Sequence, residues 1–334
     1  MKAWSVSTPG PMATRPLAFG ERPRPEPAGG QVRVRVSVCG VCRTDLHLAE
    51  GDLAPHRPDT VPGHEVVGRV DALGPGAGRF KVGQRVGVAW LASTCGTCDF
   101  CRQGRENLCV EPLFTGWDRD GGFAEYTVAD ERYVYPLPEG LDDQTAAPLL
   151  CAGIIGYRAL RRAALPPGGR LGIYGFGASA HITLQVALAE GAEVHVMTRS
   201  EDARRLALSL GAASAQGSDD PSPVPLDSAI LFAPVGTLVP VALRELERGG
   251  TLAVAGIHLS DIPALNYQRH LFQERTLTSV TANTRHDGEE FLRIAARIGL
   301  RPTTSPYRFD AVHEALADLA ADRVNGAAVV HVAG

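Results

Sequence analysis

Four closely spaced cysteines constrain the fold of this chain more than any other feature. They form a C-x2-C-x2-C-x7-C run made of Cys95, Cys98, Cys101 and Cys109. Four soft thiolates at this spacing make a tetrahedral pocket for zinc that is closed to water and therefore structural. The loop that carries them has to fold around the ion, so the sequence predicts one metal site that supports structure and takes no part in chemistry.

The chain contains seven cysteines in all. Their odd number, the tight spacing of the run and the absence of an export signal favour reduced thiolates on metal over disulfides. The N-terminal sequence MKAWSVSTPG has no apolar region of the signal-peptide kind, and no apolar run reaches membrane-spanning length. We therefore expect a cytoplasmic protein that does not contact a membrane.

The length of 334 residues fits two domains of common size, and a hydrophobic content of 44% supplies material for both cores. The 33 basic and 37 acidic residues give a net charge of −4. Basic stripes interleaved with aromatic residues do not occur, which argues against nucleic acid as a partner.

The first half of the chain has the pattern of a β structure. Gln31–Val38 alternates polar and apolar residues, as a half-buried strand does. Further strand candidates, separated by glycine- and proline-rich turns, are Glu65–Leu73, Arg85–Trp90 and Phe123–Ala129. Short strands with frequent turns favour a partly open barrel with loop insertions, and the cysteine run lies in one such insertion.

From about Thr145 onwards, helices and strands alternate. The predicted helices are Ala147–Ala163, Ala178–Glu190 and one that Ser200 caps and that runs through Leu210. The predicted strands are Arg170–Tyr174, Glu193–Met197, Ser228–Phe232, Thr251–Ala255 and Leu277–Thr281. This alternation predicts a parallel, doubly wound sheet. Three prolines in Gln216–Pro225 predict a loop or one short turn in place of a crossover helix.

A glycine-rich loop follows the strand Arg170–Tyr174 and opens a helix. It matches G-x-G-x-x-G/A, with alanine in the third position, and consists of Gly175, Phe176, Gly177, Ala178, Ser179 and Ala180. Gly175 permits a tight turn, Gly177 lets the backbone approach a pyrophosphate, and Ala180 allows close packing of the helix. A plain tight connection is the alternative, but the strand–loop–helix context favours dinucleotide binding.

The end of the next strand bears on which dinucleotide is bound. An acidic residue there would bind the ribose hydroxyls of NAD, whereas this chain has Thr198, Arg199 and Ser200. A guanidinium can hold the 2′-phosphate of NADP, with hydroxyls donating hydrogen bonds. Alternatively, Arg199 is a solvated loop residue, and the adjacent Glu201 and Asp202 would repel a phosphate unless they point away. The missing acid favours NADP over NAD.

A second set of potential metal ligands is scattered along the chain. Cys42 ends the segment Cys39–Cys42, His64 stands between Gly63 and Glu65, and Cys151 comes much later. Two thiolates and an imidazole would leave a fourth zinc position open to water or substrate. Spacing this wide does not establish a site, because Cys151 could be a small buried hydrophobe. Cys39 and Cys42 could also form a redox dithiol.

Taken together, these motifs resemble those of the zinc-dependent medium-chain alcohol dehydrogenases, near a bacterial cinnamyl- or propanol-type branch. The resemblance spans nearly the whole chain in the family's order: Gly40–Asp45 (G-x-C-x-x-D), Gly63–Glu65 (G-H-E), the cysteine run, Gly121–Tyr126 (GGFAEY), Cys151, Gly175–Ala180 and Gly326–Val329. It implies a GroES-like catalytic domain, residues 1–148 and 285–334, and an inserted Rossmann domain, residues 149–284. A helix from about Gly288 and a strand at Ala327–Val332 would then return to the first domain.

The resemblance also implies roles for single residues. The catalytic zinc ligands would be Cys42, His64 and Cys151, which leaves Cys39 as a filler at a strand end. Asp45 would orient His64, and Glu65 would lie close behind the metal. Thr44 would hydrogen-bond the substrate oxygen, and His47 would complete a proton relay to solvent. Arg43 would contact the cofactor pyrophosphate, and Trp90, with Trp117 as a further candidate, would line the substrate pocket.

The predicted reaction is reversible hydride transfer between a primary or secondary alcohol and its aldehyde or ketone, with two zinc ions per chain and NADP favoured over NAD. A non-catalytic NADP-binding scaffold and an enoyl- or quinone-type reductase of the same superfamily are the alternatives, and the complete ligand set argues against both. The expected partners are a small-molecule substrate and further copies of the chain, in a homodimer or homotetramer. The apolar region Ile257–Val280 is a candidate interface.

Overall fold

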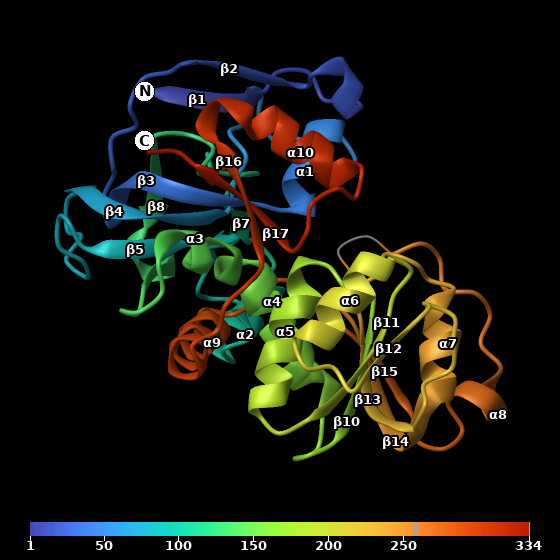
Figure 1. Ribbon diagram of the computed structural model, residues 1–334. Coiled ribbons are helices and arrows are strands. Elements are labelled where there is room, and N and C mark those ends of the chain that lie inside the picture. The colour runs from blue at the N-terminus through green and yellow to red at the C-terminus, as the bar shows by residue number, and fades with distance from the viewer. Residues whose placement is uncertain (257–258, 334) are drawn as a thin grey trace. The chain divides into compact units, whose positions relative to one another are not determined.

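The computed structural model describes residues 1–256 and 259–333 (Figure 1). The chain forms two compact units: Met1–Cys151 with Ala282–Gly334, and Ala152–Thr281. Within the described residues, no helix is both long and apolar enough to cross a membrane. The candidate interface Ile257–Val280 begins with two residues, 257 and 258, that lie outside the described part.

A mixed sheet forms the centre of the first unit. Its strand order is β16-β17-β3-β4-β5-β9, and β8 also pairs with β3. These strands are β3 (Gln31–Val41), β4 (Glu65–Leu73), β5 (Arg85–Val88), β8 (Tyr126–Asp130), β9 (Val134–Pro136), β16 (Thr304–Arg308) and β17 (Ala327–His331). Neighbours pair antiparallel except β16 and β17, which are parallel.

The predicted half-buried strand in Gln31–Val38 is more deeply buried than its alternation suggested. In β3 only Arg35 is exposed, and Arg33 is 6% exposed because its guanidinium pairs with Asp71 at 2.7 Å. The reason is topological, because β3 pairs with β4, β8 and β17 and so has partners along both edges. Its valines form part of the first unit's core.

Smaller elements complete the first unit. β1 (Lys2–Val6) pairs with β2 (Leu17–Glu21), and β6 (Leu91–Ser93) pairs with β7 (Leu113–Phe114). The α-helices are α1 (Arg43–Glu50), α2 (Asp99–Arg102), α3 (Asp143–Ala146), α9 (Arg285–Ile298) and α10 (Val312–Ala320). The 3-10 helices are η1 (Met12–Thr14), η2 (Glu106–Leu108), η3 (Glu131–Tyr133), η4 (Ala147–Leu150) and η5 (Phe309–Ala311).

The second unit is built on a six-stranded parallel sheet of order β12-β11-β10-β13-β14-β15. Its strands are β10 (Arg170–Tyr174), β11 (Glu193–Met197), β12 (Ser214–Gln216), β13 (Leu226–Leu231), β14 (Leu246–Val254) and β15 (Thr276–Ser279). Its helices are α4 (Ala152–Ala163), α5 (Ala178–Ala189), α6 (Glu201–Ser209), α7 (Leu238–Glu245) and α8 (Tyr267–His270). Figure 1 shows α5 and α7 on opposite faces of the sheet, as right-handed crossovers in opposite directions require.

This sheet confirms the predicted doubly wound architecture. The order of its strands reverses direction at β10, the strand that precedes the glycine-rich loop. A loop joins β12 to β13 where three prolines predicted one, and Ser200 caps α6 by accepting from the backbone N–H of Ala203 at 3.3 Å.

The single helix predicted over Ala147–Ala163 is wrong. The chain forms η4, leaves the helical region at Cys151 (φ −128°, ψ −70°) and starts again as α4. The apolar periodicity continues through the break, but tertiary packing overrides it. Leu150 is fully buried and lies so close to Gly87 of β5 that a Cβ there would be 2.7 Å from it. Cys151 therefore occupies a break in the backbone.

Candidate active site and metal centres

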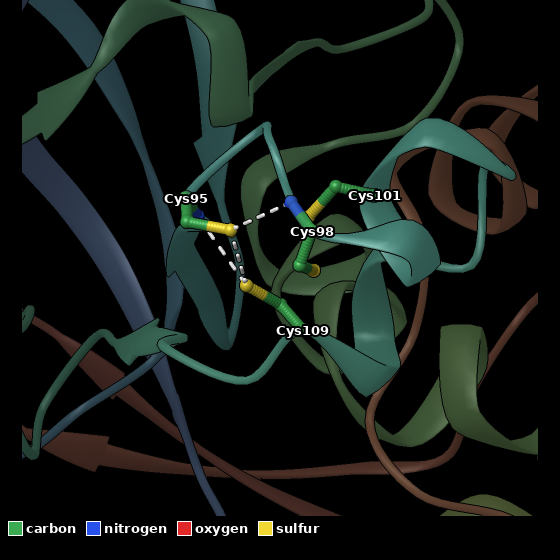
Figure 2. A group of neighbouring side chains, drawn as sticks. All are labelled: Cys95, Cys98, Cys101 and Cys109. Atoms are coloured by element: carbon green, nitrogen blue, oxygen red, sulfur yellow. Dashed lines mark hydrogen bonds between the residues drawn. The ribbon is translucent and has the colours of Figure 1, made fainter.

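The four cysteines of the run meet in one cluster (Figure 2). Their sulfur atoms all lie within 4.8 Å of one another, and all four are free thiols. Cys95 Sγ and Cys109 Sγ are 3.5 Å apart, and the backbone N–H groups of Cys95 and Cys98 donate to Cys109 Sγ and Cys95 Sγ, each at 3.3 Å. The N–H groups of Thr97 and Cys98 lower the pKa of the Cys95 thiol to about 6. Four such sulfur donors fit a zinc ion.

The scattered ligands also come together. The potential ligand atoms of Cys42, His64, Glu65 and Cys151 lie within 4.8 Å of one another. Cys42 stands between β3 and α1, His64 directly precedes β4, and Cys151 occupies the break between η4 and α4. Cys42 Sγ and Cys151 Sγ are 3.9 Å apart. Three distant segments of the sequence therefore converge on one point.

His64 gives the clearest sign that this second cluster holds a further group. Its side chain is 1% exposed, and its Nδ1 lies 3.1 Å from Asp45 Oδ1. Its Nε2 is buried and makes no hydrogen bond to any described residue. Leaving a buried polar atom unpaired costs about 1–3 kcal/mol. Two thiols and an imidazole nitrogen are donors that zinc prefers, so the cluster fits zinc.

The charges in this cluster favour the metal-binding form of Cys42. A hydrogen bond from the Cys151 thiol lowers the pKa of Cys42 well below its ordinary value, against the opposing effect of burial, and His64 lowers it further. Burial by itself lowers the pKa of His64, but the Asp45 carboxylate and Cys42 together raise it above the ordinary value. Thiolates are the form of cysteine that ligates metals.

Asp45 positions two of the potential metal ligands at once. The carboxylate is 2% exposed and accepts from the backbone N–H of Cys42 at 2.9 Å and of Gly63 at 2.9 Å, besides its contact with His64 Nδ1. The hydrogen bond at Nδ1 leaves Nε2 as the nitrogen that can ligate. Asp45 therefore lies where the sequence analysis expects a residue that orients His64.

Glu65 reaches the cluster through space that Gly40 leaves open. Gly40 of β3 pairs in register with Glu65 of β4. A Cβ at Gly40 would lie 1.8 Å from Glu65 Oε2. Glu65 is 2% exposed, so its carboxylate is confined between the two strands beside the potential cysteine and histidine ligands.

Thr44 and His47 lie in the first turns of α1. Thr44 is 6% exposed, and its Oγ1 is 3.7 Å from Cys42 Sγ. Residues three apart share a helix face, which places His47 beside Thr44 and farther from the cluster. His47 Nδ1 lies 3.0 Å from Asp52 Oδ2, and its side chain is 18% exposed. The Thr44 hydroxyl thus lies at the cluster, and the His47 imidazole lies farther out, where it reaches solvent.

Arg43, the expected pyrophosphate contact, forms an ion pair with Asp322. Both side chains are exposed, at 45% and 67%. Exposed pairs of this kind contribute little free energy, so an anionic ligand can compete for the guanidinium.

A row of aromatic rings leads away from His64. Trp90 meets the His64 imidazole edge-on, with ring centroids 4.9 Å apart. Phe114 stacks on Trp90 at 4.7 Å, and Trp117 lies nearly parallel to Trp90 at 6.2 Å. His56 stacks on Trp117 at 4.1 Å, and its Nδ1 lies 2.6 Å from Asp118 Oδ1. We call the rings of Trp90, Phe114, Trp117 and His56 the aromatic row. It leads from the buried His64 to the exposed His56.

The glycine-rich loop in the second unit has the geometry that a dinucleotide requires. Gly175 has φ +84°, and a Cβ there would be 2.8 Å from the backbone nitrogen of Ala233. Gly177 is the N-cap residue of α5 and has nothing within 4 Å of its Cβ position, while Ala180 is fully buried. The open space at Gly177 and the N-terminus of α5 form a cradle for phosphate. Next to the loop, His181 is buried, which lowers its pKa to about 4, and its Nδ1 is 3.2 Å from the Gly177 carbonyl.

In the turn after β11, the two acidic residues pair with an arginine other than Arg199. Glu201 lies 2.9 Å from Arg205, and Asp202 also pairs with Arg205. Arg204 donates to the carbonyls of Thr198 and Arg199 at 3.0 and 2.9 Å. The Arg199 side chain makes no hydrogen bond or ion pair within the described residues. The positive charge of Arg205 therefore offsets the repulsion that Glu201 and Asp202 would exert on a phosphate near Arg199.

Comparison with known proteins identifies the family. Residues 28–139 match the alcohol dehydrogenase GroES-like domain family. The protein named "Probable alcohol dehydrogenase AdhA" from Mycobacterium tuberculosis (strain CDC 1551 / Oshkosh) is 59% identical over 335 residues, which cover 99% of this chain and 97% of that protein. The chain belongs to the zinc-containing medium-chain alcohol dehydrogenases. As an alcohol dehydrogenase it is an oxidoreductase that acts on alcohols and binds NAD(P).

Further relatives of this alcohol dehydrogenase support the same assignment. An alcohol dehydrogenase from Geobacillus stearothermophilus is 37% identical, with 94% of this chain and 95% of that protein covered. The structure of a cinnamyl alcohol dehydrogenase from Sorghum bicolor superposes with a TM-score of 0.91 at 29% identity, covering 100% of this chain and 98% of that chain. These matches confirm the predicted GroES-like and Rossmann architecture.

Two residues near the site of this alcohol dehydrogenase were absent from the sequence analysis. Phe114 belongs to the aromatic row, and its position close to Trp117 was the available signal. Asp52 pairs with His47, and the only hint was an acidic residue just beyond the end of α1. His56 is exposed at 52%, as a surface residue would be, but it also stacks on Trp117.

Proposed function

We propose that this alcohol dehydrogenase catalyses reversible hydride transfer between a primary or secondary alcohol and its aldehyde or ketone, with NADP(H) as the preferred dinucleotide. We further propose one catalytic zinc at Cys42, His64 and Cys151 and one structural zinc at the four-cysteine cluster. The observation that carries this proposal is the buried, unpartnered Nε2 of His64 beside two thiols and the Thr44 hydroxyl. When bound, zinc supplies Lewis-acid chemistry and the nicotinamide accepts or donates the hydride.

Each residue around the cluster has a separate role in the proposed reaction. Asp45 holds His64 in the tautomer that ligates through Nε2. Thr44 hydrogen-bonds the substrate oxygen, and it accepts the proton that an alcohol loses as it gives its own hydroxyl proton towards His47. His47 passes the proton to solvent, and the Asp52 carboxylate orients its imidazole. Glu65, behind the ligands, adds negative charge next to the metal.

The preference for NADP rests on the turn after β11. Arg199 is exposed, it lacks a protein partner among the described residues, and the hydroxyls of Thr198 and Ser200 flank it. Because Glu201 and Asp202 pair with Arg205, they leave the guanidinium available to a 2′-phosphate. The open space at Gly177 would take the pyrophosphate, and Phe176, Ala178 and Ser179 complete the loop. Arg43 would exchange Asp322 for the pyrophosphate.

The aromatic row supports a substrate class as well. Flat rings beside His64 favour alcohols and aldehydes whose carbinol or carbonyl carbon carries an aryl or conjugated group, because aromatic pairs gain about 0.5–1.5 kcal/mol beyond area burial. Trp90 is the residue proposed to contact the substrate. Two relatives in these comparisons are named cinnamyl alcohol dehydrogenases, from Nicotiana tabacum and Arabidopsis thaliana.

A homo-oligomer, dimer or tetramer, is also proposed. Tyr267 and Phe272 are 60% and 56% exposed and pack edge to face within Ile257–Val280, the candidate interface. Light scattering during gel filtration gives the mass directly, and a monomeric mass at micromolar concentration would reject this part of the proposal. We expect the protein in the cytoplasm.

The test is the initial rate of aldehyde reduction with NADPH and NADH in parallel, on a panel from short aliphatic aldehydes to cinnamaldehyde. We expect the highest kcat/KM with NADPH and an aryl-conjugated aldehyde, and loss of turnover after chelation. NADH as the better donor would reject the cofactor assignment and keep the dehydrogenase. Unchanged turnover in a Cys151→Ala variant would reject the catalytic metal cluster.

A further inference from the structure

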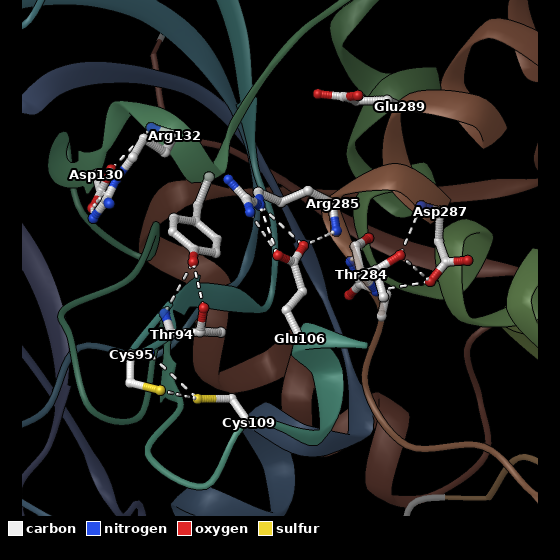
Figure 3. Close-up of polar contacts among 12 residues, drawn as sticks. Thr94, Cys95, Glu106, Cys109, Asp130, Arg132, Thr284, Arg285, Asp287 and Glu289 are labelled. Atoms are coloured by element: carbon white, nitrogen blue, oxygen red, sulfur yellow. Dashed lines mark hydrogen bonds and ion pairs between the residues drawn. The ribbon is translucent and has the colours of Figure 1, made fainter. Parts of the chain in front are cut away.

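An ion pair between the buried Glu106 carboxylate and the partly exposed Arg285 guanidinium ties the four-cysteine loop to the segment by which the chain re-enters the first unit (Figure 3). Glu106 belongs to η2, just before Cys109, and is 6% exposed. Arg285 is the first residue of α9. Its Nε and Nη2 donate to the Glu106 carboxylate at 3.0 and 2.6 Å, and its backbone N–H donates to the same carboxylate at 2.7 Å. This bidentate geometry is the strong form of such a contact.

The same arginine is linked to the other end of the loop. Its guanidinium lies 4.8 Å from the centre of the Tyr133 ring. The Tyr133 hydroxyl is 2.7 Å from Thr94 Oγ1 and accepts from the Thr94 backbone N–H at 3.1 Å. Thr94 directly precedes Cys95. Arg285 therefore contacts Glu106, three residues before the last cysteine, and is linked through Tyr133 to Thr94, which directly precedes the first cysteine.

The loop needs such ties because its own regular structure is small. Within it, the described elements are α2, of four residues, and η2, of three. A short loop with little secondary structure explores many arrangements when its metal leaves, and only a few of them bring four sulfur atoms within bonding distance. Anchors at both ends reduce this freedom and so favour recapture of the ion over its escape.

The charge balance supports a dedicated role for the pair. Burial alone would raise the pKa of Glu106, but the hydrogen bonds and charge of Arg285 lower it below the ordinary value. A buried carboxylate without a cationic partner would be strongly destabilising. Within the described residues, Arg285 is the one cation that forms an ion pair with Glu106. Arg132, close by, is paired with Asp130, and Arg79 with Glu289.

We propose that Glu106 and Arg285 are positioning residues for the four-cysteine metal site: their ion pair, with Tyr133 and Thr94, holds both ends of the loop in the ligating arrangement and slows loss of the metal. This inference rests on the proposed binding of zinc by the four cysteines. It concerns metal retention and has no direct part in hydride transfer.

The experiment measures cysteine alkylation in the zinc-loaded enzyme during exposure to chelator, with peptide mass spectrometry reporting each cysteine separately. The variants are Glu106→Gln and Arg285→Gln, their double variant, and Thr94→Val as a milder change. Glu289→Gln is the matched control, because Glu289 also belongs to α9 but pairs with Arg79 on the exposed surface at 3.4 Å. We expect alkylation of the four loop cysteines to accelerate about tenfold in both charge variants, with Cys42 and Cys151 unchanged and the control like the parent.

The double variant separates a working pair from two independent residues. If the pair acts as a unit, the double variant loses zinc from the loop no faster than either single variant. Rates within twofold of the parent, equal acceleration at all metal-binding cysteines, or acceleration in Glu289→Gln would each overturn the inference. If Glu106→Gln does not fold, Thr94→Val and Arg285→Lys must still accelerate loop alkylation for the inference to stand. Parent loop cysteines that react as fast as those of zinc-free enzyme would instead reject the proposed metal site itself.

Discussion

Among single residues, Gly40 shows most directly how the sequence makes room for the site. The backbone of Gly40 follows an ordinary strand, so alanine there would not strain φ. The methyl group would instead occupy the position of the Glu65 carboxylate, with Glu65 Cδ and Cβ at 2.8 and 2.9 Å, so a rotation of the side chain tip does not relieve the clash. The glycine of this G-x-C motif therefore leaves room for the Glu65 carboxylate of the opposite strand beside the candidate metal cluster.

We predict that Gly40→Ala lowers zinc content from two to about one per chain and reduces kcat/KM at least tenfold, because displaced Glu65 disturbs His64 next to it. Elemental analysis and initial rates measure both effects. Gly20→Ala is the matched control, since Gly20 also lies in a strand, with nothing within 4 Å of its Cβ position. Full zinc content and activity in Gly40→Ala would show that Glu65 does not need this space.

Arg199 is the residue on which the proposed preference for NADP rests. We predict that Arg199→Ala raises KM for NADPH about 10- to 100-fold and leaves KM for NADH within twofold, because a charge-assisted hydrogen bond contributes about 1.5–3 kcal/mol. Steady-state kinetics with both dinucleotides measure this. Arg248→Ala, which changes another exposed arginine of the second unit, should alter neither constant. Equal effects of Arg199→Ala on both dinucleotides would contradict the proposed phosphate contact.

Among the secondary-structure elements, the β6–β7 pair and the turn after it carry most of the aromatic row. Trp90 directly precedes β6, Phe114 ends β7, and the Trp117 indole is fixed by donating to the Ala54 carbonyl at 2.8 Å. The two short strands thus hold three rings in nearly parallel planes, with interplanar angles of 10° to 19°. Rigid, parallel rings suit a flat substrate better than a flexible aliphatic one.

We predict that Trp117→Leu lowers kcat/KM for cinnamaldehyde about five- to tenfold relative to a short aliphatic aldehyde, which corresponds to about 1 kcal/mol of lost stacking. Competition between the two aldehydes in one reaction gives this ratio directly. Phe272→Leu, which removes an exposed ring of the second unit, is the control and should leave the ratio unchanged. An equal loss for both aldehydes would indicate a structural role for Trp117.

The second unit contains an electrostatic link between two neighbouring strands. Arg170 of β10 donates to the Asp227 carboxylate of β13 through its backbone N–H, Nε and Nη2, at 2.8, 3.0 and 2.9 Å. These hydrogen bonds lower the pKa of Asp227 below the ordinary unfolded value of about 3.9. The link therefore stabilises the fold above about pH 3.9 and is lost as the pH falls through the lower, folded pKa.

We predict that Asp227→Asn lowers the Tm of the zinc-loaded enzyme by about 2–4 °C at pH 7, and that the difference narrows as the pH falls from 5 to 3. Thermal unfolding followed at several pH values measures this. Asp310→Asn serves as the control, since its partner Arg308 is 85% exposed and no change is expected. A Tm difference that is constant with pH would mean that charge does not explain the effect.

For the whole molecule, two metal clusters in the first unit imply two kinds of metal loss. A site of four thiolates is closed, whereas a site of two thiolates and one imidazole keeps an open position through which ligands exchange. The two clusters share no residue. Activity and stability should therefore respond to chelation separately.

We predict that brief chelation removes about one zinc per chain together with all activity while Tm changes little, and that prolonged chelation removes the second zinc and lowers Tm. Zinc content, initial rate and Tm are measured on the same samples over time. Added zinc should restore activity to the briefly treated enzyme. Simultaneous loss of both zinc ions, or retained activity at one zinc per chain, would contradict this separation.

The sequence alone determined the class of this protein, because its information is local and periodic. Strands such as Glu65–Leu73 and Arg170–Tyr174 were predicted with the bounds that the structure has, and the order of the motifs identified the family before any geometry was known. A cysteine run or a glycine-rich turn is encoded within a few residues. Such signals survive without tertiary information.

Only the tertiary structure decided what depends on contacts between distant segments. It broke the helix predicted through Cys151, because Leu150 packs against Gly87, and it brought Cys151 within 3.9 Å of Cys42. It also turned Glu201 and Asp202 towards Arg205. Packing and long-range pairing are not encoded in a periodic pattern of the sequence, because each depends on which surfaces meet after folding.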